Sequence, residues 1–99
     1  MGKIDVLDLD ISIAKYICKG LKKYIKENEK AVFPTAPDYT FFEGLSKDTS
    51  LEDRVKEWHL VLNKVAEKFD KISNEYKASE EDVNDAFDEL KRVYKGLWI

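Results

Sequence analysis

Four acidic residues in the C-terminal part of this 99-residue sequence have a spacing that could support chemistry. Glu81, Asp85 and Glu89 follow one another at intervals of four and Asp88 lies beside them, so a helix would place them on one face. Carboxylates arranged in this way can hold Mg²⁺ or Mn²⁺ next to a phosphorylated substrate. A metal site would need a second set of carboxylates facing them from another helix. The acidic residues of the preceding helix alternate with lysines, as in ordinary surface pairing: Lys64, Glu67, Lys68, Asp70, Lys71 and Glu75. We therefore favour a solvated face and predict neither a metal nor a cofactor.

The segment Asp8-Leu9-Asp10-Ile11-Ser12 has the D-x-D-x-(T/S) spacing of aspartate-nucleophile phosphatases. That chemistry needs the first Asp at the end of a buried parallel strand, and the sequence predicts no such strand. We interpret this segment instead as the start of a helix, with Asp10 or Ser12 as its cap and Asp8 near its positive end.

Histidine and cysteine, which could act as a base, a nucleophile or a metal ligand, each occur only once in the sequence. His59 is the only histidine and has no second His or Cys with which to form a zinc site, which favours packing at the edge of the core. Cys18 is the only cysteine and falls among apolar residues, so we expect a buried thiol and no disulfide. The sequence thus predicts a protein that is not an enzyme.

A basic stripe runs along the first predicted helix, opposite its apolar side. It consists of Lys15, Lys19, Lys22, Lys26 and Lys30. Residues 11–30 carry six Lys and two Glu, a balance of +4, whereas residues 79–90 carry six acidic and no basic residues, a balance of −6. Three explanations stay open: compensation between the first and third helices, contact with an anionic partner such as nucleic acid, or solubility alone. Nucleic acid is not favoured, because the stripe contains no Arg.

Apolar residues at intervals of three and four predict three helices, over residues 11–29, 50–77 and 80–95. The middle helix carries a heptad stripe formed by Leu51, Val55, Trp58, Leu62, Val65, Phe69, Ile72 and Tyr76. The flanking helices have their apolar sides at Ile13, Ala14, Ile17, Cys18, Leu21, Tyr24 and Ile25, and at Val83, Ala86, Phe87, Leu90, Val93, Tyr94 and Leu97. The bulky aromatics in the heptad stripe favour packing within the chain over a coiled-coil dimer. The expected fold is all-α, a three-helix bundle forming a single domain over residues 1–99.

Local signals mark the ends of these helices. Thr49 and Ser50 both offer a capping start for the middle helix, and Ser79 offers one for the third. Gly20 interrupts a good helical context and is expected where another backbone comes close, whereas Gly96 is expected to end the third helix.

The connection between the first two helices, residues 31–48, contains Pro34 and Pro37, which forbid a regular helix. It is too apolar for a free linker, so we predict an ordered, aromatic-rich loop. Its aromatics and the C-terminal Trp either pack on the end of the core or stay exposed to a partner. The candidate partner-binding residues are Phe33, Tyr39, Phe41, Phe42 and Trp98.

The composition and charge of the sequence predict where the protein is located and which partners it lacks. The sequence has no apolar run of about 18 residues, which predicts no membrane-spanning helix and no membrane partner. Acidic residues occupy the region where a secretory signal would be apolar, so a soluble cytoplasmic protein is expected. The net charge of −3 argues against a general polyanion binder. We expect a monomer or a weak homodimer.

Four motifs run through almost the whole chain in a fixed order. They are Asp8-x-Asp10, Ala14-Lys15-Tyr16-Ile17, Glu57-Trp58-His59-x-x-Leu62 and Leu97-Trp98. In this order they resemble a group of small phage and prophage-type proteins of unknown function. The proline that this group has shortly after A-K-(F/Y)-I is absent here, where Lys19 and Gly20 stand. The resemblance implies a helical fold and a mobile-element origin, and it implies no activity.

The sequence therefore predicts a small phage or prophage accessory protein that binds a protein partner without catalysis, in the host cytoplasm. One alternative is a helical protein that contacts nucleic acid through the lysine stripe. The other is a metal-dependent nucleotide hydrolase that uses Glu81, Asp85, Asp88 and Glu89.

Overall fold

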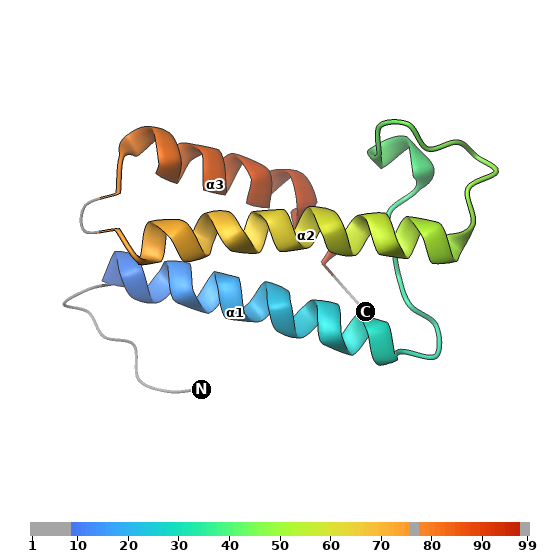
Figure 1. The fold of residues 1–99 in the computed structure, drawn as a ribbon, viewed down its shortest axis with the longest axis horizontal. Helices are drawn as coiled ribbons and strands as arrows, with labels where there is room; N and C mark the ends of the chain where they lie inside the picture. Colours follow the sequence, from blue (N-terminus) through green and yellow to red (C-terminus); the bar gives the residue numbers. More distant parts are fainter. Residues whose placement is uncertain (1–8, 76–77, 98–99) are drawn as a thin grey trace.

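The computed structural model describes residues 9–75 and 78–97, and within them the chain is all-α (Figure 1). Helix α1 spans Leu9–Lys30, α2 spans Leu51–Ser73 and α3 spans Glu80–Val93. Two short 3₁₀ turns, η1 (Tyr39–Phe41) and η2 (Tyr94–Gly96), lie in the long connection and after α3. The predicted three-helix bundle is confirmed.

Helix α2 lies between the other two helices, and each of them runs antiparallel to it (Figure 1). α1 packs along much of α2, whereas the shorter α3 packs against the C-terminal half of α2. The Cα atoms extend over 48 × 29 × 17 Å, so the three helices form a flattened bundle. As a result, α2 contributes to two interfaces, and α1 and α3 contribute mainly to one each.

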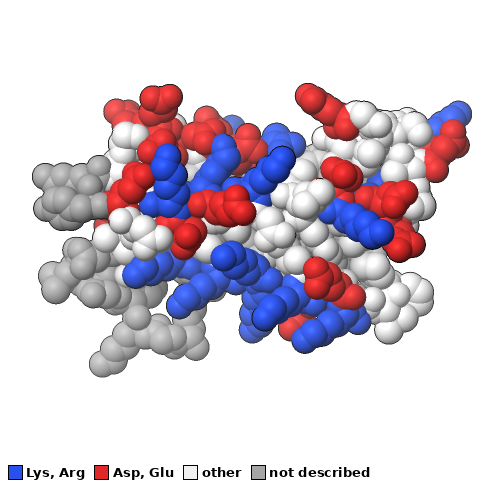
Figure 2. Space-filling model, in the orientation of Figure 1, with Lys and Arg blue, Asp and Glu red and all other residues white. Residues whose placement is uncertain are grey.

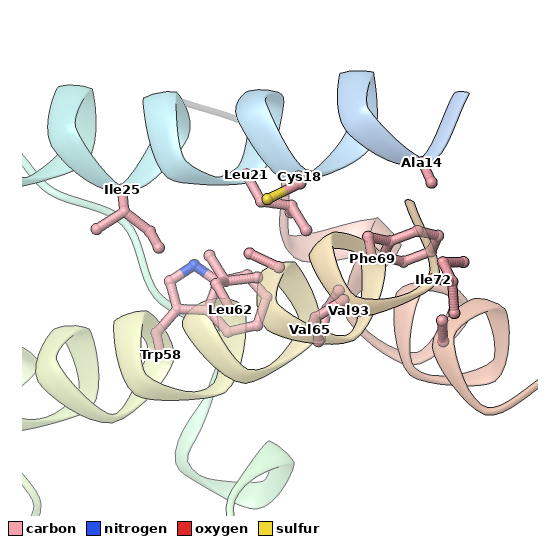
Figure 3. Close-up of a cluster of buried hydrophobic side chains, with 12 residues drawn as sticks. Ala14, Cys18, Leu21, Ile25, Trp58, Leu62, Val65, Phe69, Ile72 and Val93 are labelled. Carbon is pink, nitrogen blue, oxygen red and sulfur yellow. The ribbon is translucent and has the colours of Figure 1, made fainter. Parts of the chain in front are cut away.

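From Val55 to Ile72, the heptad stripe of α2 is buried within its own chain, as predicted. Trp58, Leu62 and Phe69 are fully buried and point from α2 toward its neighbours (Figure 3). The flanking helices complete the core with Ala14, Cys18, Leu21 and Ile25 from α1, and Ala86 and Val93 from α3.

Four residues assigned to apolar faces are exposed, and those predictions are wrong. Leu51 is 44% exposed. Asn28, near the end of α1, contacts His59, and Leu51 lies about 12 Å further along α2, beyond the cover of α1. Ile13 and Tyr94 lie at the margins of their helices' apolar sides and are 43% and 70% exposed. Phe87 is 42% exposed, because only part of its ring is covered by the contact with Phe69 of α2. Tyr76, the last member of the predicted stripe, lies outside the described residues.

Side-chain caps fix where α2 and α3 begin. Of the two candidates for α2, Ser50 is the cap: its Oγ accepts a hydrogen bond from the Asp53 backbone N–H at 3.1 Å. Ser79 does the same for α3, accepting from the Asp82 N–H at 3.1 Å. α1 already includes Leu9, so Asp10 and Ser12 both lie within it and the prediction that one of them is the cap is wrong. Asp8 lies outside the described residues.

α2 ends at Ser73, four residues before the predicted end. The Ser73 hydroxyl and the Asn74 side-chain amide both donate to the carbonyl oxygen of Asp70, at 2.7 and 2.8 Å. These polar side chains satisfy a carbonyl of the last turn, which ends the helix before residues 76–77. α3 gives way to η2 after Val93, two residues before the predicted end.

Gly20 and Gly96, the two glycines considered in the sequence, have different surroundings. A Cβ built on Gly20 would meet nothing within 4 Å, so the expected close backbone approach is wrong. Gly96 instead lies in η2 against the indole of Trp58, where a Cβ would be 2.8 Å from two ring carbons. Its role is close packing at the end of the bundle.

Among the described residues, no helix has the length and apolar character needed to cross a bilayer.

Candidate functional site

The loop that follows α1 crosses the end of the bundle and carries most of the candidate partner-binding residues (Figure 1). Phe41 packs edge-on against the fully buried Trp58, with ring centroids 5.4 Å apart, and against Phe42 at 5.1 Å. The Arg92 guanidinium of α3 lies 4.9 Å from the centre of the Phe41 ring. Phe41 and Phe42 therefore cap the core, and Tyr39 beside them is half-buried.

Phe33 differs from the other loop aromatics. It is 85% exposed, and its neighbour Val32 is also 85% exposed. Two adjacent large apolar side chains thus stand in water just beyond α1. We call Val32 and Phe33 the apolar tip. Trp98, the remaining candidate, lies outside the described residues.

Asn28 holds both ends of the segment that carries the apolar tip. At one end, the backbone N–H of Ala31 donates to the Asn28 carbonyl at 3.3 Å. At the other end, the Thr35 N–H donates to Asn28 Oδ1 and Asn28 Nδ2 donates to the Thr35 carbonyl, each at 2.9 Å. Asn28 itself is fully buried. The tip is therefore displayed from an anchored backbone.

His59 of α2 is the next member of this network. Its Nε2 lies 2.9 Å from Asn28 Nδ2, and its Nδ1 lies 3.8 Å from the Glu29 carboxylate. The side chain is almost completely buried, deeper than the expected position at the edge of the core. Burial lowers the pKa of His59, and the nearby Glu29 carboxylate opposes that shift with a smaller raising effect.

Tyr24 extends the same network to the end of α3. Its hydroxyl accepts a hydrogen bond from Trp58 Nε1 at 3.3 Å and lies 3.1 Å from Thr35 Oγ1. It donates to the Gly96 carbonyl at 3.2 Å. Throughout the part of the chain that is described, no buried side-chain nitrogen or oxygen lacks a hydrogen-bond partner. One connected polar network therefore joins α1, the loop, α2 and η2.

The lysine stripe is exposed along α1, where basic side chains gather in Figure 2. Within residues 9–75 and 78–97, none of Lys15, Lys19, Lys22, Lys26 and Lys30 forms an ion pair. The positive charges of the stripe are thus not paired with the acidic side chains of α3. The ion pairs that α3 forms with another helix among the described residues are with α2 instead, by Lys68 with Asp85 and by Lys71 with Asp82 at 3.5 Å.

The four carboxylates proposed for a hydrolase do not come together as a cluster. Asp85 pairs with Lys68 of α2, and Glu89 pairs with Arg92 on its own helix at 3.2 Å. Glu81 and Asp88 are exposed. No group of three or more His, Cys, Asp or Glu side chains among the described residues could hold a metal ion.

Sequence reasoning missed Val32, Asn28 and Thr35. An apolar pair placed between the last Lys of a helix and a proline was an available signal for the tip. Asn28 lies on the buried side of α1, at an interval of three from Ile25, and a polar residue in such a position needs a hydrogen-bonding partner. Nothing in the sequence pairs it with His59, which is 31 positions away.

Comparisons with known proteins add no relative. No family model matches the chain, and no significant match was found among the curated proteins or the solved structures.

Proposed function

We propose that this protein is a non-catalytic interaction module that binds a protein partner by inserting the apolar tip, Val32 and Phe33, into a pocket of that partner. One observation carries the proposal: both side chains are 85% exposed although Asn28 hydrogen-bonds the backbone on either side of them. Leaving large apolar side chains in water forgoes stabilisation that burial would supply. A held backbone lowers the entropic cost of binding.

The other loop aromatics have a supporting role in this proposal. Phe41 packs against Trp58 and Arg92, and Phe42 packs against Phe41, so these rings hold the loop on the core. Tyr39 is half-buried and can contribute at the rim of an interface. A phage or prophage origin and a cytoplasmic location belong to the same proposal, the first through the resemblance of the motifs and the second through the sequence composition.

The experiment compares proteins captured from the host lysate by the wild-type chain and by a Val32→Ser, Phe33→Ser double variant. Both substitutions lie at exposed positions, so the fold should persist. A partner that uses the tip as its main anchor should bind the variant roughly tenfold more weakly or worse. The matched control is Leu60→Ser, which removes an apolar side chain that is 54% exposed on α2. Equal capture by all three proteins would contradict the proposal.

A nucleic-acid contact through the α1 lysines is a second candidate, and the absence of described ion pairs along that stripe favours it. Phosphate contacts make binding strongly dependent on salt. Binding of a labelled DNA duplex should then weaken steeply between 50 and 200 mM salt, and replacing Lys15, Lys19 and Lys22 by Ala should reduce the slope. No binding at the lower salt concentration would remove this candidate.

A further inference from the structure

The hydrogen bonds around Asn28 fix the position of the proton on His59. A backbone N–H can only donate, so the atom that meets the Thr35 N–H is the Asn28 carbonyl oxygen Oδ1. The amide nitrogen Nδ2 must then face both the Thr35 carbonyl and His59 Nε2, each at 2.9 Å. Because Nδ2 can only donate, Nε2 must accept. The single proton of the neutral ring is therefore on Nδ1, facing Glu29.

A second proton on His59 is incompatible with this arrangement. It would go on Nε2 and would point at the donor Nδ2 of Asn28. Turning the Asn28 amide over would relieve that conflict at His59. It would also place Nδ2 against the Thr35 N–H and Oδ1 against the Thr35 carbonyl, which breaks both bonds to Thr35. We call these two bonds between Asn28 and Thr35 the Asn28–Thr35 clamp. Protonation of His59 and an intact clamp thus exclude each other in this packing.

The charged groups that face the ring are few. From α1, the Glu29 carboxylate favours the protonated form. The loop contributes the uncharged Thr35 through Asn28. On α2, Lys56 lies one turn before His59, is exposed and pairs with Glu52 at 3.8 Å. Among the described residues of α3, none has an interaction with the ring. Burial, which disfavours the protonated form, has the larger effect on the pKa of His59.

We propose that protonation of His59 opens the Asn28–Thr35 clamp, so that the apolar tip is held in neutral solution and released in mildly acidic solution. That this opening regulates binding by the apolar tip rests on the proposed function. The opening of the clamp itself does not depend on that function. The native state takes up the proton less readily than the opened state, because its His59 pKa is lowered. Opening is therefore favoured as the pH falls below about 6.5, and the effect is absent well above that value.

The first test needs no variant. In protein with ¹⁵N-labelled histidine, the NMR shifts of the ring nitrogens at pH 7.5 report where the proton sits. We expect a protonated Nδ1 and an unprotonated Nε2. A proton on Nε2 at this pH would overturn the proposal, since Asn28 would then have to face the other way.

The second test measures amide hydrogen exchange at Thr35, corrected for the intrinsic rate at each pH. Between pH 7.5 and 5.5 we expect its protection to fall by up to about tenfold. His59→Gln retains an acceptor close to the position of Nε2 but does not titrate, so in this variant protection should stay constant. The Phe42 amide, which donates to the Tyr39 carbonyl in the same loop, is the internal control and should not respond in either protein.

These readouts separate the switch from the function of the tip, because neither uses a partner. Equal pH responses of Thr35 in the wild-type protein and in His59→Gln would overturn the switch, whatever the tip binds. A Thr35 response in the wild-type protein alone supports the switch even if the Val32→Ser, Phe33→Ser variant captures the same proteins. If His59→Gln does not fold, the wild-type protein decides the question: unchanged protection of Thr35 relative to Phe42 between pH 7.5 and 5.5 would overturn the switch.

Discussion

The two interfaces of α2 are built differently. Toward α1, it buries Ala14, Cys18, Leu21 and Ile25, and the interface ends in the buried contact between Asn28 and His59. Toward α3, the fully buried residues are the small Ala86 and Val93. A ring contact between Phe69 and Phe87, with centroids 5.1 Å apart, and the two ion pairs of α3 with Lys68 and Lys71 complete that second interface.

This difference indicates which of the two interfaces contributes more to the free energy of unfolding. Apolar burial scales with the area removed from water, and the longer α1 buries the larger side chains. The groups that hold α3 are partly solvated: Phe87 is 42% exposed, and exposed ion pairs contribute little. The α1–α2 pair is therefore the stable unit, and α3 should open at a lower free-energy cost.

The largest contrast should come from truncating one core residue in each interface. Leu21→Ala in α1 should lower the free energy of unfolding by about 2–5 kcal/mol, because it removes a branched side chain that is 4% exposed. Val93→Ala in α3 should cost about 1–2 kcal/mol, since it deletes two methyl groups. Urea denaturation followed by circular dichroism measures both. A larger cost at Val93 would reverse our ranking of the interfaces.

Asn28→Ala probes the polar part of the α1–α2 interface. It leaves the Thr35 N–H and His59 Nε2 without their partner, so we expect a loss of about 1–3 kcal/mol in the free energy of unfolding. Asn63→Ala on the exposed side of α2 is the matched control, with an expected change within about 0.5 kcal/mol. Similar effects of the two substitutions would show that the network adds little to stability.

The two glycines test whether close packing at the end of α3 matters. Gly96→Ala would push a methyl group to 2.8 Å from the Trp58 ring, and it should destabilise the protein by about 1–3 kcal/mol. Gly20→Ala meets nothing within 4 Å, and it should stabilise α1 by about 1 kcal/mol. Opposite shifts in the thermal midpoint are expected. Two shifts in the same direction would be inconsistent with the packing described.

The smallest effect should come from the ion pair between Lys68 and Asp85. A double-mutant cycle with Lys68→Ala and Asp85→Ala should give a coupling of about 0.2–1 kcal/mol, because both side chains are partly exposed. The coupling should shrink when the salt concentration is raised toward 1 M. A coupling that does not change with salt would show that α3 is held by a more deeply buried contact than this pair.

Much of the fold could be predicted because its signals are local. The heptad stripe predicted the buried face of α2, and Ser50 and Ser79 cap the helices that follow them. Prediction failed at both ends of α2, at one end because of a local contact and at the other because of the position of a neighbouring helix. α2 ends early because Ser73 and Asn74 bond the Asp70 carbonyl, and Leu51 is exposed because α1 ends before reaching it.

The candidate site was predicted less well, because contacts between residues far apart in the sequence decide it. The sequence proposed the loop aromatics as a set, and the structure separates Phe33, which is exposed, from Phe41, which rests on Trp58. That separation depends on which element the folded loop crosses. The lysine stripe was visible as a pattern, but only the placement of α3 on the other side of α2 shows that the acidic helix pairs elsewhere.

By itself, the sequence determined three amphipathic helices and a loop that is not a free linker, because hydrophobic periodicity, capping residues and prolines act over a few neighbouring positions. The tertiary structure alone decided that Asn28 meets His59 and Thr35, that Gly96 packs on Trp58, and that Val32 and Phe33 face water. Those outcomes depend on residues distant in the chain coming within hydrogen-bond or van der Waals distance, and no local spacing encodes them.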